Sequence, residues 1–240
     1  MVKNPLWLLL LFFGLISCHD KPTFPETPSI RLNDYYFREI QNTTGGPNLQ
    51  DSIVIKVRFE DGNGDLGLDA FETQPPYHLY DVLVENGDTL KYGDDPSLPP
   101  YNCYDYEILT KTISQGDSLF VQSDTIYVIR NLDHYNFFLT FLVQQRPDDE
   151  FVPYDTYQNL CAAPFHGRYF VLNTARDVRP LTGELQYGFI SSFRLLFRNY
   201  NSIKMRIQIQ DRRLNKSNIL ETEPFRVDEI VLPPYVPPGS

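Results

Sequence analysis

Alanine and methionine, two residues that favour helices, are scarce in this sequence of 240 residues. It contains four alanines and two methionines, against 16 tyrosines, 17 phenylalanines and 19 prolines. Aromatic residues favour strands, and proline is excluded from helix interiors. The composition therefore predicts strands and turns. With 42% hydrophobic residues, the chain can also form a substantial core, which excludes disorder over most of its length.

Basic residues are in short supply as well. Lysine and arginine number 21 against 31 aspartates and glutamates, so the formal net charge is -10 at pH 7. A nucleic-acid-binding protein neutralises phosphate groups with a basic surface. The charge balance predicts that nucleic acid is not a partner.

No hydrophobic run is long enough to span a bilayer as a helix, which takes about 20 residues. The longest apolar run covers residues 6–16 and follows Lys3. A short positive start and an apolar segment of about 7–15 residues are typical of an export signal. We therefore expect residues 1–17 to be a signal peptide.

The Leu-Ile-Ser-Cys motif that ends at Cys18 resembles the lipobox of bacterial lipoproteins. The resemblance implies that Cys18 is lipidated and then N-acylated, for instance with palmitate, so that several acyl chains hold the protein on the membrane. Asp20 does not directly follow Cys18, which favours the outer membrane. Residues 18–28 contain three prolines and predict an extended tether. An ordinary secreted protein is the alternative.

Two cysteines remain in the exported part of the chain, Cys103 and Cys161. Disulfides persist outside the cytoplasm, and an even number of cysteines favours one. A bridge that closes a loop of this size would stabilise the fold by roughly 4 kcal/mol. Two buried free thiols are the alternative.

Alternation of apolar and polar residues is strongest in two segments, 52–59 and 203–210. A period of two is typical of a half-buried strand. Phe193, Leu196, Phe197 and Tyr200 follow a helical spacing instead and predict a short helical turn. Weaker strand candidates lie at 30–40, 81–84, 104–111, 119–130, 136–144, 169–172, 184–190 and 219–227.

This pattern predicts an all-β protein, an immunoglobulin-like β-sandwich over residues 29–232. The span is about twice the length of one such domain, and residues 74–102 are rich in proline, glycine and tyrosine. We therefore expect one sandwich with a long insertion in its middle. Two sandwiches that divide near residues 95–115 are the alternative. Residues 233–240 are proline-rich and predict a disordered tail.

The first strong strand is followed by Asp61, Asn63 and Asp65, with glycines between them. Calcium takes six to eight oxygen ligands, and alternating Asp or Asn with Gly lets a loop curl around an ion. An EF-hand is not expected, because Leu66 occupies the sixth position, where a glycine is needed. A tight turn whose side chains bind their own backbone is the alternative.

A second polar loop, residues 211–218, follows the strand at 203–210. In an immunoglobulin-like arrangement the two loops leave the sandwich at the same end. Asp211, with or without Asn215, would then complete a calcium site. Alternatively, Arg212 and Arg213 would pair with the acidic residues of the first loop and make a metal unnecessary.

No catalytic motif is apparent, and the four histidines are scattered without the spacing of metal ligands. We therefore expect a protein that is not an enzyme and that binds or scaffolds another envelope protein. Binding of glycans is the alternative, because tyrosines combine an apolar ring with a polar tip. The candidate residues for it are Tyr77, Tyr80, Tyr101 and Tyr104.

Several stretches resemble a family of uncharacterised cell-envelope lipoproteins of Bacteroidota. They are Phe-Glu-Asp-Gly-Asn-Gly-Asp-Leu-Gly at 59–67, Pro-Pro-Tyr-Asn-Cys-Tyr-Asp-Tyr-Glu at 99–107, Gly-Arg-Tyr-Phe at 167–170 and the segment 209–222. The resemblance covers most of the exported chain and implies an immunoglobulin-like β-sandwich on a lipid anchor. It implies no catalytic residue. Arg213 stands where the family usually has alanine.

The lipid anchor is directly testable. We expect Cys18→Ser to move the protein from the membrane fraction to the soluble envelope fraction, because the thiol that accepts the lipid is lost. Mass spectrometry of the wild-type amino terminus should show an acylated Cys18. An unmodified mature terminus would contradict the prediction.

Overall fold

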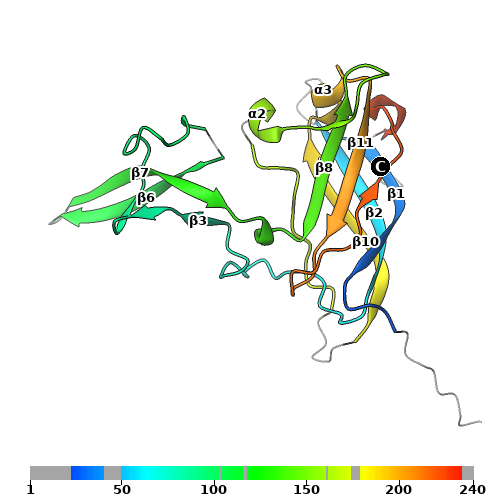
Figure 1. Cartoon of the computed structure of the whole chain (residues 1–240), viewed down its shortest axis with the longest axis horizontal. Helices are drawn as coiled ribbons and strands as arrows, with labels where there is room; N and C mark the ends of the chain where they lie inside the picture. The colour runs from blue at the N-terminus through cyan, green and yellow to red at the C-terminus, as the bar shows by residue number, and fades with distance from the viewer. Residues whose placement is uncertain are drawn as a thin grey trace, which may run out of the picture.

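The protein is an all-β sandwich from which a long β-ribbon projects (Figure 1). The computed structural model describes residues 23–40, 50–102, 104–115, 118–160, 162–173 and 179–233. The expected signal peptide, Cys18, Cys103, Cys161 and nearly all of the expected tail lie outside the described residues. In the described part of the chain, no helix is long and apolar enough to cross a membrane.

The first sheet of the sandwich has the strand order β10-β2-β1-β13 among the described residues. Strand β2 runs antiparallel to both of its neighbours, and β13 runs parallel to β1. The four strands are β1 (Ser29–Glu39), β2 (Asp51–Asp61), β10 (Leu181–Ser191) and β13 (Val231–Leu232).

The second sheet has the order β12-β11-β8-β9, and all of its neighbours are antiparallel. Its two long central strands are flanked by two short ones. The strands are β8 (Phe137–Gln144), β9 (Val152–Pro153), β11 (Ser202–Ile209) and β12 (Leu220–Glu221).

The core lies between these sheets and follows from the alternation in the sequence. Every second residue of β2 points inward, from Ile53 to Phe59, and so does every second residue of β11, from Ile203 to Ile209. The helical turn predicted near residue 193 is confirmed as α3 (Phe193–Phe197). Its Phe193 packs on Phe141 of β8 with a ring separation of 5.5 Å, and thereby closes one end of the core.

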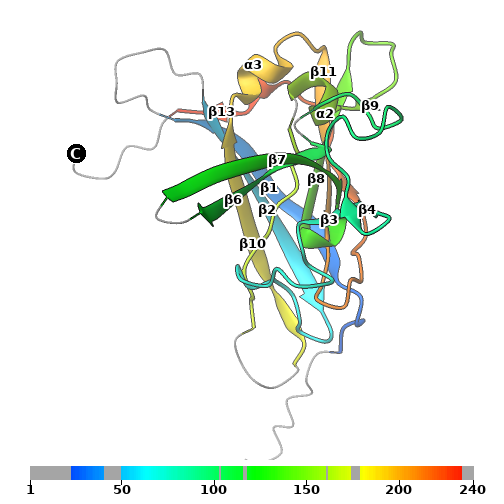
Figure 2. The same ribbon diagram turned by 90° about the vertical axis from the view of Figure 1, so that its left-hand side faces the viewer.

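The insertion predicted in the middle of the chain forms an arm, defined here as strands β3 to β7. Its main part is the antiparallel β6–β7 ribbon. Figure 1 shows the ribbon extending away from the sandwich, and in Figure 2 the ribbon crosses in front of the sandwich. The strands are β3 (Tyr80–Val82), β4 (Val84–Glu85), β5 (Asp88–Thr89), β6 (Tyr106–Gln115) and β7 (Ser118–Arg130). The arm thus continues well past residue 102, because the strands expected at 104–111 and 119–130 belong to it.

Two expected strands differ in the structure. Residues 169–172 are irregular. In the segment 219–227, Leu220–Glu221 forms β12 and Phe225 forms an isolated bridge with Ile203, before η2 (Val227–Glu229) begins. Apolar residues in both segments fill gaps at the edge of the core, as Tyr169 and Phe225 do. Tyr169 is buried without a strand partner, and such burial gives the same sequence signal as burial in a sheet. The remaining short elements are η1 (Leu132–His134) and α2 (Thr156–Leu160).

Candidate divalent-cation site

Asp61 is the last residue of β2 and continues the inward alternation of that strand. Its side chain is completely buried. The loop that follows turns sharply through Gly64 and Gly67, which have φ values of 68° and 98°. A β-carbon at Gly64 would lie 2.0 Å from the carbonyl oxygen of Arg179. Glycine is therefore required there, both for the left-handed backbone and for the close approach.

Asp211 lies two residues after the end of β11, whereas Asp61 is the last residue of β2. Asp211 extends the inward series of β11 by one more step and is 1% exposed. A β-bridge between Leu66 and Asp211 joins the two loops. The two strands therefore end at the same edge of the sandwich, as the sequence predicted, and their loops meet there.

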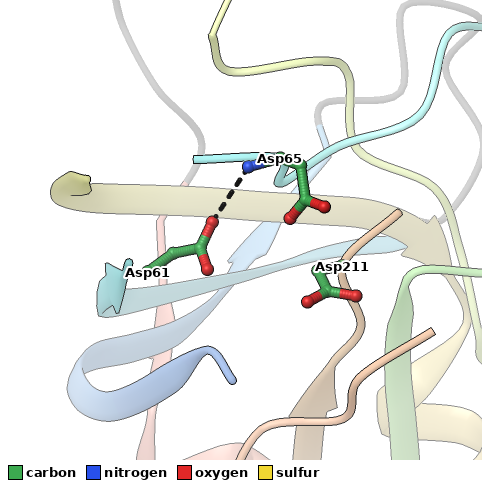
Figure 3. A group of neighbouring side chains, drawn as sticks. All are labelled: Asp61, Asp65 and Asp211. Carbon is green, nitrogen blue, oxygen red and sulfur yellow. Dashed lines mark hydrogen bonds between the residues drawn. The ribbon is translucent and has the colours of Figure 1, made fainter. Parts of the chain in front are cut away.

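Three carboxylates converge where the loops meet, those of Asp61, Asp65 and Asp211 (Figure 3). One oxygen from each lies within 4.8 Å of the others. Ligands at 2.3–2.6 Å from a shared calcium ion are at most about 5 Å apart, so a single ion can contact all three. The site offers hard oxygen ligands, which suit calcium better than zinc.

Two of these carboxylates have an unsatisfied oxygen. Asp61 Oδ1 and Asp65 Oδ1 are inaccessible to solvent and have no hydrogen-bond partner among the described residues. The other oxygen of Asp61 accepts a hydrogen bond of 3.1 Å from the backbone N–H of Asp65. A buried carboxylate oxygen without a partner is costly. A cation between the loops would supply the missing partner to both residues.

The electrostatics of the cluster agree with this geometry. Burial, together with the charges of Asp65 and Asp211, raises the pKa of Asp61 to about 6. Burial and the charge of Asp211 also raise the pKa of Asp65. The negative charges are thus insufficiently compensated by the protein alone, and a divalent cation would reverse both shifts.

One of the two arginines that were predicted to pair with the acidic loop in place of a metal does so. Arg213 Nε lies 3.4 Å from Asp65 Oδ2, but its side chain is 55% exposed, so the pair is screened by water. Arg212 pairs with Glu72 instead. These contacts leave the inner oxygens of Asp61 and Asp65 without a hydrogen-bond partner.

The alternative of a self-bonded turn also holds in part. Asp211 Oδ1 accepts hydrogen bonds of 2.8 Å from the backbone N–H groups of Arg213 and Asn215, and Asp211 Oδ2 accepts one from the side chain of Asn215. Asn215 therefore orients Asp211. Asn63, the fourth predicted ligand, is 5% exposed, and its Oδ1 accepts a 3.4 Å hydrogen bond from the N–H of Asp65.

Residues beyond the predicted ligands hold the site together. Asn136 is buried. Its side-chain amide donates a hydrogen bond of 3.0 Å to the backbone carbonyl of Tyr169 and accepts one of 2.8 Å from the backbone N–H of Tyr169. The hydroxyl of Tyr169 in turn donates to the carbonyl of Gln210 at 3.3 Å. No local sequence motif marks Asn136, because its partner lies 33 residues away in an irregular segment.

The four tyrosines predicted for glycan binding do not form one platform. Tyr77 donates its hydroxyl to the carbonyl of Arg212. Tyr80 and Tyr104 both contact the guanidinium of Arg130, with separations of 5.6 and 5.3 Å from the ring centres. Tyr101 packs edge-on against another tyrosine. These contacts favour a structural role at the base of the arm.

Tyr104 and Tyr157, which lie near the two predicted disulfide cysteines in the sequence, contact each other. Tyr104 follows Cys103 directly and Tyr157 lies four residues before Cys161, and the centres of their rings are 6.0 Å apart. Tyr157 also donates its hydroxyl to Asp105 at 3.4 Å. Both cysteines lie outside the described residues, so the predicted disulfide stays a prediction.

Comparisons with protein-family models, curated proteins and solved structures find no match.

Calcium should stabilise the wild-type protein. At a free concentration about 100 times the dissociation constant, a single site adds about 2.7 kcal/mol to the free energy of unfolding, which raises the melting temperature by roughly 5–10 °C for a chain of this size. Asp61→Asn should abolish this response and stabilise the calcium-free protein, because it removes a buried charge. Differential scanning calorimetry with calcium or with a chelator measures both effects. Asp148→Asn, at an exposed loop position, is the matched control. Equal responses in all three proteins would contradict the site.

Without a cation, the pH dependence of stability should carry the signature of Asp61. Its folded-state pKa of about 6 exceeds the ordinary value of 3.8, so between these pH values the folded state binds more protons than the unfolded state. The free energy of unfolding therefore falls as the pH rises from about 4 to about 6, by roughly 2–3 kcal/mol. Urea unfolding in chelator should show this fall in the wild type and a smaller one in Asp61→Asn. Parallel profiles would rule out the assignment.

Proposed function

We propose that this protein is a cell-envelope lipoprotein that acts as a non-catalytic binding module, presenting its arm to another envelope protein. In this proposal Cys18 anchors the chain to the outer membrane and calcium stabilises the sandwich. The observation that carries the proposal is the arm, whose β6–β7 ribbon stands clear of the sandwich (Figure 1) and exposes apolar side chains near its end. Leu119, Phe120 and Val121 are 73%, 53% and 70% exposed. Clustered apolar exposure of this kind is typical of an interaction surface.

The arm is attached to the sandwich next to the candidate cation site. The loop that begins at Asp61 leads into β3, and on the way Glu72 pairs with Arg212 and Tyr77 donates to the Arg212 carbonyl. Arg212 itself donates its backbone N–H to the carbonyl of Asp65 at 3.3 Å. An ion held by Asp61, Asp65 and Asp211 would therefore stabilise the base from which the arm projects.

The described histidines have structural contacts that support a role without catalysis. Burial lowers the pKa of His166 to about 4, and its Nδ1 faces the backbone N–H of Leu139 at 3.3 Å. His134 contacts the carbonyl of Tyr77 at 3.0 Å, and His78 pairs with Asp81 at 2.8 Å. None of the three is part of the acidic cluster.

Photo-crosslinking in intact cells tests the proposal. A photoreactive residue at Phe120, near the end of the arm, should give an adduct of defined mass that contains a second envelope protein. The matched control is Phe71, which is 89% exposed but lies in the loop before the arm, and the same substitution there should not give this adduct. Adducts that are absent, or identical at the two positions, would contradict the proposal.

A further inference from the structure

Strand β6 forms one edge of the arm. Among the described strands it pairs with β7 on one side and with no strand on the other. The edge is ten residues long and contains no proline or glycine, and Ile and Thr make up four of its positions. Natural proteins usually protect such an edge with proline, bulges or several charges, because its free N–H and C=O groups pair readily with another strand. The composition of this edge is typical of a strand that pairs with another strand when the protein functions.

We infer that a second copy of this chain covers the edge, with the two β6 strands antiparallel about a two-fold axis at Leu109. This inference rests on the proposed function, because it names the arm as a contact surface and identifies one partner. It leaves the face of the joined ribbon that carries Phe120 open to another envelope protein.

The charges of β6 select this register. An axis at Leu109 places Glu107 opposite Lys111 of the second copy, and the symmetry repeats that pair. Lys111 is exposed and forms no ion pair within the described residues. Glu107 is 34% exposed and pairs with Arg130 on its own arm, so one side of its carboxylate stays accessible. An axis at Lys111 would instead place two ammonium groups opposite each other, which is unfavourable.

The apolar residues of the arm agree with the same register. Leu109 is 37% exposed and would meet its own copy across the axis. Tyr106 would lie opposite Thr112 of the second copy, whose neighbour on β7 is Val121. Val121 is thereby brought to the same face as Tyr106 and its neighbours Tyr92 and Tyr101, both of which are about half exposed. Exposed aliphatic and aromatic groups would then cover one another.

Sedimentation equilibrium of the full chain carrying Cys18→Ser, which has no acylation site, measures the association. We expect a mass of twice the monomer. Leu109→Lys and Lys111→Glu should each raise the dimer dissociation constant at least tenfold, because the first places two charges at the axis and the second places like charges opposite each other. Ile190→Lys, at an exposed position of the sandwich, should leave the constant unchanged.

A cysteine probe tests the register itself. In the same background, Leu109→Cys should form a disulfide-linked dimer on oxidation, since the two positions face each other across the axis, while Ile113→Cys and the parent chain should not. A monomer at every concentration, or a dimer that Leu109→Lys leaves intact, would overturn the inference.

The two proposals can fail separately. A monomeric chain that still gives the Phe120 adduct with another protein would overturn the dimer and leave the proposed function standing. A dimer with Phe120 adducts to its own copy alone would support the dimer and contradict binding of another envelope protein.

Discussion

Burying a carboxylate oxygen without a hydrogen-bond partner destabilises a fold unless a cation compensates the charge, and here three carboxylates meet where β2 and β11 end. Asp61 and Asp211 are buried because they continue the inward alternation of their strands. The core therefore holds them in place, and their repulsion acts directly on the two loops. A bound calcium ion would convert this repulsion into an attachment between the two sheets.

The same corner of the sandwich supports the arm. The chain leaves the acidic loop for β3 and passes Glu72 and Tyr77, both of which contact Arg212. It returns from β7 through η1 to Asn136, whose carbonyl accepts from the N–H of Gln210 at 3.0 Å. Both connections of the arm thus end beside Asp211. Because they are fixed at the site, the stability of the site and the orientation of the arm are linked.

Much of the sandwich was predictable from local pattern. The alternation over 52–59 and 203–210 defines β2 and β11, and both strands begin and end within two residues of the expected bounds. The convergence of Asp61 and Asp211 was also predictable, because two strands that run in the same direction carry their following loops to the same end. The pattern failed at 169–172, where Tyr169 is buried by Asn136 and Gln210 rather than by a strand partner. The immunoglobulin-like strand order remains a prediction.

The sequence by itself determined the all-β class and the inward faces of the long strands. It also determined the loop after β2, in which glycines alternate with Asp and Asn residues. Each of these depends on neighbours a few residues apart, where side-chain periodicity and backbone freedom act directly. Only the tertiary structure decided which side chains would hold the loops, and that the segments at 104–111 and 119–130 would leave the sandwich as an arm. Those outcomes depend on contacts between residues far apart in the chain, and a strand in the arm has the same alternation as a strand in the core.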